Sequence, residues 1–315
     1  LSSSSNFLKV KGILYRLTFL IYIPGSKHRH MFLAVPNIFL RSLRAKGSIS
    51  KLKSENLPGT QITNTFQDFT WKDLLDGLSC TECGRCQEVC PAYAAGSSLS
   101  PKTFILDLRD GMFTSQKSSM KADDYSIAGE LIKSDTLWAC TTCRACMEAC
   151  PVHIEHVPKI VKLRQSLVEN GDIEPTLQQT LSSMQRTGNS FDKPEKMRAK
   201  WTRSLSFRPK DARQDDVDVL WFVGDFASFD PRAQRSTIIV AELMQRAGVN
   251  FGILYEGERN SGNDVLRAGD EGLFEILAAQ NIDEINGSVV VCKNQTCSEK
   301  LKNLEEINSF IKSSF

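Results

Sequence analysis

The sequence of 315 residues predicts an α+β protein with several domains: a helical domain with two cysteine-rich loops, a small α/β domain after it, and a membrane-associated segment before it. Three observations predict this class. Two cysteine runs of the same spacing lie between segments of helical period. A β-α-β-α-β-α pattern follows them, which indicates a parallel sheet. A stretch that is both basic and apolar precedes them.

The two cysteine runs both read C-x2-C-x2-C-x3-C-P and end at Pro91 and Pro151. Bacterial ferredoxins use this spacing, with three thiolates of a loop on one [4Fe-4S] cluster and the fourth on the other cluster. The cluster presents iron at four corners, and such a short loop can reach three of them. We therefore predict two [4Fe-4S] clusters with crossed ligands, the first held by Cys80, Cys83, Cys86 and Cys150 and the second by Cys140, Cys143, Cys146 and Cys90.

Two other uses of these cysteines stay open. Structural zinc sites also use C-x2-C spacings, but zinc needs neither the third cysteine at the same interval nor the proline. A disulfide framework is typical of short secreted chains. The iron–sulfur interpretation is preferred because it accounts for the whole pattern.

The charge of the chain is distributed unevenly. Apolar content of 41% and charged content of 24% are ordinary for a globular protein. The net charge of +2 combines ten Lys and Arg without any Asp or Glu in residues 1–54 with 29 basic and 37 acidic residues in 55–315. Such a basic start is typical of nucleic-acid-binding arms, transit peptides and the cytoplasmic edge of membrane segments.

The order of residues in the basic start favours a membrane, and no nucleic-acid partner is expected. Residues 12–23 are apolar apart from Arg16, with basic residues on both sides. A bilayer span needs about 20 residues, so we expect an interfacial helix or the end of a longer span. The start at Leu1 instead of Met is consistent with an upstream region. A buried amphipathic helix and a presequence are the alternatives.

Changes in composition predict five segments: a membrane-edge segment in 1–45, a linker in 46–66, a helical two-[4Fe-4S] ferredoxin domain in 67–186, a linker in 187–214 and an α/β domain in 215–315. Thr70 to Asp73 forms a capping-box pattern, and Ser100-Pro101 is a second helix start. The 49 residues between Cys90 and Cys140 are helical by pattern. They favour a helical ferredoxin domain over the small βαββαβ type.

Two more helices are predicted after the second cysteine run, in 157–168 and 175–186. The first carries lysines and arginines that we assign to its solvent-exposed face. His153 and His156 are expected outside the ligand sets, because four cysteines complete each cluster.

The last hundred residues alternate between strand and helix patterns. Strands are predicted in 217–223, 251–255 and 288–291, and helices in 233–246, 269–280 and 299–311. A site in such a domain forms in the loops after the strands. Those loops carry Asp225, residues 256–264, Cys292 and Cys297.

The chain resembles, over nearly its whole length, the membrane-bound iron–sulfur oxidoreductases of the heterodisulfide reductase D-like family, such as electron-transfer flavoprotein:menaquinone oxidoreductases. The similar stretches are 23–30, then 69–77 with the two cysteine loops and 100–109, and then 223–232 with 261–280. The resemblance implies a haem-b-binding membrane domain, a two-cluster ferredoxin domain and cysteine-rich "CCG" domains. His30 stands four places after Ser26, where the family has a haem ligand.

The α/β domain departs from the family at the positions of the cluster-binding cysteines. The family places a cysteine at the position of Asp225, and Cys-Cys or Cys-Thr at Asn260-Ser261. Its closing C-x2-C aligns with Asn294 and Cys297, which leaves Cys292 out of register. The resemblance therefore implies a degenerate CCG-like domain without its cluster. Cys292 and Cys297 are expected to be buried or idle thiols, with a third metal site as the alternative.

The resemblance implies electron transfer through the two clusters, between a soluble donor such as electron-transfer flavoprotein and a membrane haem or quinone site. The chain is then expected to be membrane-associated at the cytoplasmic face. A soluble iron–sulfur subunit of a glycolate, lactate or glycerol-3-phosphate dehydrogenase is the first alternative, and a non-catalytic scaffold is the second. The sequence has no nucleophile–base pair, Walker loop or dinucleotide fingerprint, so no substrate-converting site is expected in it.

Overall fold

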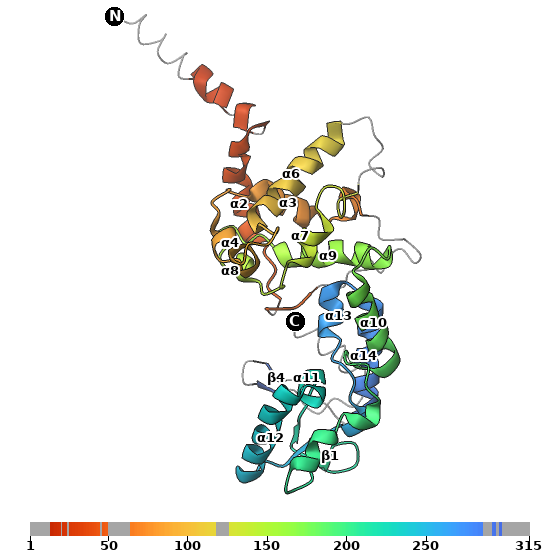
Figure 1. Cartoon of the computed structure of the whole chain (residues 1–315). Coiled ribbons are helices and arrows are strands. Elements are labelled where there is room, and N and C mark those ends of the chain that lie inside the picture. The colour runs from red at the N-terminus through yellow and green to blue at the C-terminus, as the bar shows by residue number, and fades with distance from the viewer. Residues whose placement is uncertain are drawn as a thin grey trace, which may run out of the picture. The chain divides into compact units, whose positions relative to one another are not determined.

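The computed structural model describes residues 13–19, 21–23, 25–44, 46–49, 64–117, 126–285, 292–293 and 296–297. The chain divides by its internal contacts into two compact units, residues 1–167 and 168–315. Unit 1 is helical, and unit 2 combines helices with small sheets (Figure 1). The predicted combination of a helical and an α/β part is therefore present.

Unit 1 consists of helices whose starts follow from the sequence. α3 (Trp71–Ser79) begins where it was predicted, because the Thr70 hydroxyl accepts the Asp73 N–H and the Asp73 carboxylate accepts the Thr70 N–H at 3.0 Å. α6 (Pro101–Lys117) has its proline at the first position. The other helices that begin in unit 1 are η1 (Lys27–Arg29), α2 (His30–Phe39), η2 (Phe66–Asp68), α4 (Arg85–Glu88), α5 (Pro91–Ala94), α7 (Ser134–Trp138), α8 (Ala145–Glu148) and α9 (His156–Glu169).

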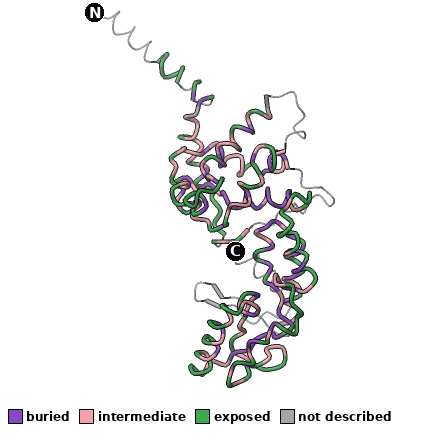
Figure 2. Tube along the Cα trace, viewed as in Figure 1, coloured by how far each residue is buried: buried purple, intermediate pink, exposed green. Residues whose placement is uncertain are grey.

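The core of unit 1 extends up to the cysteine loops. Phe104 and Ile105 from α6 and Leu137 from α7 are at most 1% exposed, and Ile160 from α9 packs in the same group of apolar side chains. Cys90 and Cys150 belong to this group. Figure 2 shows the buried residues through the middle of the helical unit. The loops are therefore held against a packed interior that limits how far their ends can move.

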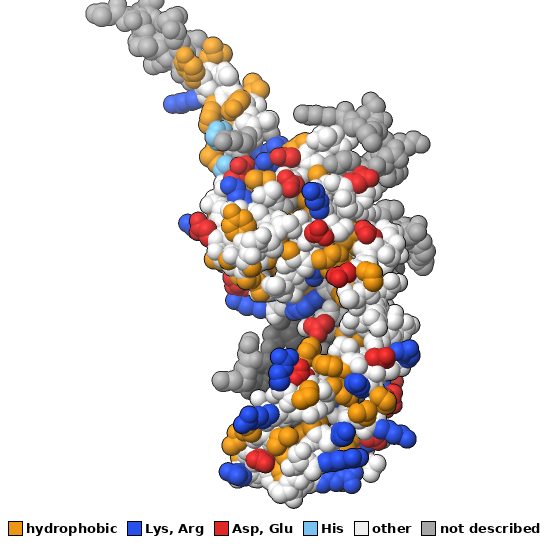
Figure 3. Space-filling view, in the orientation of Figure 1, with side chains coloured by type: hydrophobic (Ala, Val, Ile, Leu, Met, Phe, Trp, Pro, Cys, Tyr) orange, Lys and Arg blue, Asp and Glu red, His pale blue; other side chains and the backbone are white. Residues whose placement is uncertain are grey.

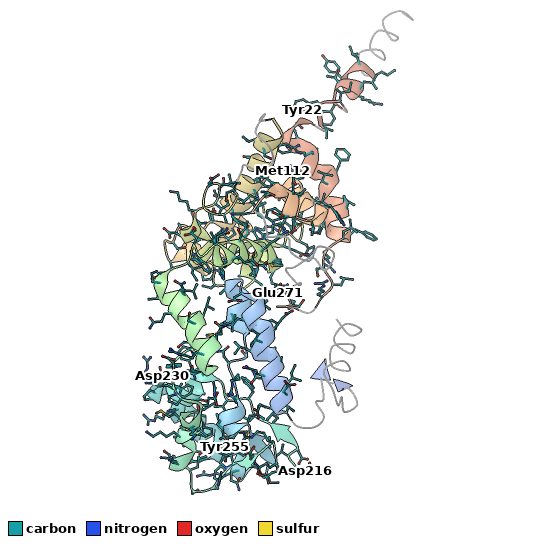
Figure 4. All side chains as sticks on the ribbon, turned by 90° about the vertical axis from the view of Figure 1, so that its right-hand side faces the viewer. Tyr22, Met112, Asp216, Asp230, Tyr255 and Glu271 are labelled. Carbon is teal, nitrogen blue, oxygen red and sulfur yellow. The ribbon has the colours of Figure 1, made fainter. Side chains whose placement is uncertain are left out.

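The N-terminal stretch of unit 1 is helical and exposes apolar side chains. Residues 13–19 and 21–23 are helical, and Tyr15 and Ile21 are 76% and 79% exposed. Hydrophobic side chains lie along this stretch in Figure 3, and Figure 4 labels Tyr22 on it. Among the described residues, no helix has the length and apolar character that a membrane crossing requires.

Unit 2 contains a parallel sheet with the strand order β1-β3-β2, formed by Lys210–Asp211 (β1), Val219–Leu220 (β2) and Phe251–Ile253 (β3). All three residues of the central strand β3 are buried. Gly252 is needed there, because a Cβ would lie 2.9 Å from Val217 Cγ1 and 3.0 Å from the Lys210 carbonyl oxygen. A second pair, β4 (Cys292–Lys293) and β5 (Thr296–Cys297), is antiparallel.

One predicted strand is shorter than expected, and another lies outside the described residues. The strand predicted as buried over 217–223 is short and partly exposed: only β2 pairs, and Val219 is 42% exposed because β2 has one partner in the described sheet. The strand predicted in 288–291 and the helix in 299–311 lie outside the described residues. β1 comes instead from residues 187–214, where a linker was predicted and where Trp201 is 3% exposed.

The helices of unit 2 pack in two groups. α12 (Pro231–Arg246) starts two residues before the predicted 233, because Asp230 accepts the Arg232 N–H and Pro231 occupies the first turn. α10 (Pro175–Thr187) packs through Leu181 and Met184 on α13 (Asn263–Ala268) and α14 (Glu271–Glu284). The remaining helices are η4 (Glu195–Met197), η5 (Lys200–Ser204), α11 (Asp225–Phe229) and η6 (Tyr255–Gly257).

Candidate metal centre

The two cysteine loops of unit 1 share one backbone path. Glu82 and Thr142, each two residues after the first cysteine, have φ angles of 57° and 53°. Gly84 and Arg144, each four residues after it, have φ angles of 82° and 67° and precede the one-turn helices α4 and α8. The sequence repeat is thus a structural repeat. Two left-handed residues per loop curl the chain tightly enough for its thiols to approach one another.

A cavity at the first loop is lined by Cys80, Cys83, Cys86 and also by Cys150, which comes from the end of the second loop. The pKa values of these thiols reflect the grouping. Burial first, and then the neighbouring Cys80, Cys150 and Cys83, raise the pKa of Cys86 to about 11. The fold therefore brings Cys150 to the first loop.

The second loop shows the reciprocal grouping. Burial first, and then Cys140, Cys86, Cys143 and Cys90, raise the pKa of Cys146 to about 12. The pKa of Cys140 is also raised by burial, and Cys143 and Cys90 contribute to the same direction. Cys90 is thus close to cysteines of the second loop, although it ends the first. Cys86 belongs to the surroundings of Cys146 as well, so the two groups are neighbours.

The donor set fits iron–sulfur clusters in its chemistry. The eight cysteines of the two loops are free thiols, and Cys83 and Cys143 are the exposed ones. Among the described residues, no three Cys, His, Asp or Glu side chains gather tightly enough to hold one metal ion. With pKa values of about 11 and 12, Cys86 and Cys146 stay protonated at neutral pH until a cation stabilises their thiolates.

Backbone amides reach the sulfur atoms of both groups. The Thr142 N–H donates to Cys140 Sγ and the Ile154 N–H donates to Cys150 Sγ, each at 3.4 Å. The N–H of Glu82 acts in the same way on Cys80 and opposes the effect of burial on the pKa of that thiol. Hydrogen bonds to ligand sulfurs are one of the means by which proteins adjust iron–sulfur potentials.

Each loop is also held by an arginine. Arg164 is 5% exposed, and its guanidinium donates to the carbonyls of Leu137 at 2.7 Å and Trp138 at 3.3 Å, and to that of Cys140. Its guanidinium also lies 5.0 Å from the centre of the Trp138 ring. At the first loop, Arg109 donates to Glu82 at 2.8 Å but is more exposed. Arg164 thus fixes the chain where it enters the second loop.

A buried charge network lies beneath the first loop, and sequence reasoning missed it. Lys159 is 2% exposed and pairs with the fully buried Asp76, which also accepts the Glu155 N–H at 3.1 Å and the Asn37 amide at 3.0 Å. Asn37 donates in addition to the Val152 carbonyl at 2.9 Å. The network therefore ties α2, α3 and α9 to the segment that follows Cys150.

The prediction of a solvent-exposed basic face on residues 157–168 was wrong for Lys159 and Arg164. Both are buried because the helix is surrounded by other elements on most sides. A signal was present for Arg164, which follows Val157 by seven residues and Ile160 by four, so it lies on the apolar stripe.

The histidines have different surroundings. His156 is 1% exposed and lines the cavity of the first loop; its Nδ1 donates to the Ile154 carbonyl at 3.1 Å. Burial, and then the Lys159 charge, lower the pKa of His156 to about 4, so this imidazole is neutral at pH 7. His153 lies outside that cavity and contacts Arg41. His30 is the first residue of α2 and is partly exposed.

In unit 2, the loops after the strands converge on an arginine. Arg198, 3% exposed, pairs with Asp225 at 2.8 Å and with Glu258 at 3.0 Å. The Asn260 amide donates to Asp225 at 2.7 Å. Asp225 and Asn260, which were predicted to replace cysteines, therefore lie together and are joined by a hydrogen bond. Cys292 and Cys297 are paired residues in the register of β4 and β5.

Comparison with known proteins agrees with this architecture. A family model described as a 4Fe-4S dicluster domain matches residues 72–151. The chain is 32% identical to a probable iron-sulfur-binding oxidoreductase, FadF, of Bacillus subtilis in an alignment of 314 positions that covers 86% of this chain and 44% of that protein. It is 33% identical to an EtfAB:quinone oxidoreductase of Syntrophomonas wolfei in an alignment of 310 positions that covers 87% of this chain and 43% of the relative.

A third relative is a component of the dihydromethanophenazine:CoB–CoM heterodisulfide reductase of Methanosarcina mazei, 29% identical over 231 residues, which cover 70% of this chain and 54% of that protein. These comparisons confirm the predicted resemblance to iron–sulfur oxidoreductases of this type, and residues 72–151 match a 4Fe-4S dicluster domain. The chain spans less than half the length of the first two relatives.

Proposed function

We propose that this chain passes single electrons through two [4Fe-4S] clusters, from a soluble donor to a quinone or haem site of a membrane domain. The first cluster is held by Cys80, Cys83, Cys86 and Cys150, and the second by Cys140, Cys143, Cys146 and Cys90. When bound, the clusters supply one-electron redox chemistry. The chain's own residues hold them close together, shield them and adjust their potentials.

The observation that carries this proposal is the exchange of the last cysteines between the loops. Cys150 lines the cavity of the first loop, and Cys90 contributes to the electrostatic surroundings of Cys140 and Cys146. Crossed ligands draw two clusters toward one another, and short distances favour electron transfer between them. The tight curl of both loops and the burial of Cys90, Cys146 and Cys150 support the same arrangement.

The relatives support a membrane-linked route. One is named an EtfAB:quinone oxidoreductase, so we assign the donor to the electron-transfer flavoprotein class and the acceptor to a quinone-linked membrane domain. The exposed apolar side chains of residues 13–19 and 21–22 and the basic residues around them suit the cytoplasmic edge of a membrane. In this proposal His30, at the start of α2, is the haem ligand at the membrane end.

Unit 2 is proposed to be a degenerate CCG-like domain. Its parallel sheet and its converging loops support that kinship, and the Arg198 network occupies the position where the loops meet. We assign it no cluster, because Asp225 and Asn260 are engaged with each other and Asp225 is paired with Arg198.

The experiment is a reductive titration of the anaerobically purified chain, with iron and acid-labile sulfide determined on the same sample. We expect about eight irons per chain and about two electrons taken up and returned reversibly, one for each cluster. About four irons, or none, would contradict the two clusters. Clusters that cannot be reduced and reoxidised would contradict electron transfer and would favour the scaffold.

A further inference from the structure

A cavity of about 410 Å³ in unit 1 lies outside the thiol groups of both loops. One wall is the chain after α2, from Arg41 to Ser48, and the other wall comes from the second loop and the segment after it, including Arg144, Glu148 and His153. The cavity is large enough for a small anion or a lipid headgroup. The electron transfer proposed above does not involve this cavity.

The lining of this cavity has surplus positive charge. Arg41, Arg44, Lys46 and Arg144 face two carboxylates, Glu148 and Glu155. The carboxylates hold the walls together, because Lys46 pairs with Glu148 at 2.8 Å and the Ser42 N–H donates to Glu155 at 3.1 Å. The Lys46–Glu148 pair is largely exposed, so it is weak and easily exchanged for another anion.

One donor in the cavity lacks an acceptor, and a second donates to a histidine. Arg144 Nε is buried and has no hydrogen-bond partner among the described residues, an arrangement that is unfavourable unless a ligand or water accepts the bond. Arg41 Nη1 lies 3.1 Å from His153 Nε2. A guanidinium can only donate, so the imidazole nitrogen is the acceptor in this contact. An anion would be a stronger acceptor for both guanidinium groups.

We propose that this cavity binds a phosphate group. Guanidinium groups from both walls match phosphate oxygens with paired N–H donors, and Lys46 adds a mobile charge. A phospholipid headgroup and free phosphate offer the same chemistry. Phe39 and Leu43, 84% and 85% exposed, flank Arg41 in the same segment and would contact acyl chains if a lipid supplies the phosphate. Only this lipid source depends on the membrane location proposed above.

The test uses the full chain with its iron–sulfur content intact, in buffer without phosphate. Calorimetric titration with inorganic phosphate measures free-anion binding. Flotation with phosphatidylcholine vesicles, with and without phosphatidylglycerol, measures headgroup binding. Arg144→Gln is expected to weaken the binding of whichever probe binds by about tenfold, because it removes one pair of charge-assisted hydrogen bonds. Arg44→Gln, which is remote in sequence from the cysteines, should act in the same direction.

The matched control is Arg85→Gln, which removes an exposed charge at the first loop, one residue after the position equivalent to Arg144. Saturable binding of phosphate that Arg144→Gln weakens and Arg85→Gln leaves unchanged supports the proposal with free phosphate as the source. The same pattern with vesicles alone supports the lipid source. Binding by neither probe, or equal weakening by Arg144→Gln and Arg85→Gln, overturns it. Iron content and reduction of each variant report separately on the electron-transfer function.

Discussion

In unit 1, thiols converge between the loops, and burial raises the pKa values of Cys86 and Cys146 among them. In unit 2, Asp225 and Glu258 pair with Arg198, and the Asn260 amide donates to Asp225. Both arrangements lie where loops of distant sequence meet. In unit 2 the protein supplies the cation itself, and each partner has a short hydrogen bond. In unit 1 the thiols become good acceptors only after a cation joins them.

This difference separates a site that is complete from a site that is prepared for a cofactor. Removing one partner of a buried ion pair leaves the other charge buried and uncompensated, so Arg198 stabilises the fold of unit 2. A buried thiol is tolerated in its neutral form, so the metal-free cysteines of unit 1 do not lower the free energy of unfolding to a comparable extent. The two units therefore respond differently to the loss of a single side chain.

The largest effect is expected from removing two cysteines in two combinations. If ligands are crossed, Cys86 and Cys150 serve the same cluster, and the pair Cys86→Ala with Cys150→Ala leaves about four irons per chain. The pair Cys86→Ala with Cys90→Ala then removes a ligand from each cluster and leaves almost none. Iron analysis of anaerobically purified protein distinguishes them. The reverse order of iron contents would show that each loop keeps all four of its own cysteines.

The second largest effect is expected on the stability of each unit when its buried arginine is replaced by methionine. Arg198→Met leaves Asp225 and Glu258 buried without their cation and should destabilise unit 2 by about 3–5 kcal/mol, with unchanged iron content. Arg164→Met removes the side-chain donor to the carbonyls of Leu137, Trp138 and Cys140 and should cost unit 1 about 2 kcal/mol. Hydrogen exchange of peptides from each unit measures both, because the units need not unfold together.

The control for these substitutions is Arg186→Met. The Arg186 side chain is 70% exposed in its pair with Asp192, so its removal should change protection little. Loss of iron in Arg198→Met would contradict the separation of the two units, as would equal protection in Arg198→Met and Arg186→Met.

The parts that could be predicted from the sequence are those set by short-range chemistry. The capping box at Thr70 and the proline start at Pro101 are confirmed because each depends on residues within one turn. The cysteine spacing is equally local, and the ligand roles that it indicates stay a prediction. The buried networks were missed because their partners are far apart: Asn37 and Asp76 are separated by 39 positions, and Asp76 and Lys159 by 83.

The smallest effect concerns two thiols of the first loop. Burial would raise the pKa of Cys83, but the Arg85 N–H and the Thr81 hydroxyl lower it below its usual value of 9.0, whereas the pKa of Cys86 is raised to about 11. At pH 8 in the metal-free chain, the thiolate fraction of Cys83 exceeds that of Cys86 by about a hundredfold or more. The lower nucleophilicity of the weaker base reduces this to about tenfold in alkylation rate.

Timed alkylation with iodoacetamide, followed by peptide mass spectrometry, measures these rates. Raising the pH from 8 to 9 should increase the alkylation rate of Cys86 about tenfold, because its pKa lies well above this interval. The alkylation rate of Cys83 should increase by less, because its pKa is below 9.0. Circular dichroism of the metal-free chain shows that helices are retained. Equal alkylation rates for the two cysteines in a folded sample would mean that burial does not raise the pKa of Cys86 above that of Cys83. The contrast between the thiols of unit 1 and the Arg198 ion pairs of unit 2 would then be wrong.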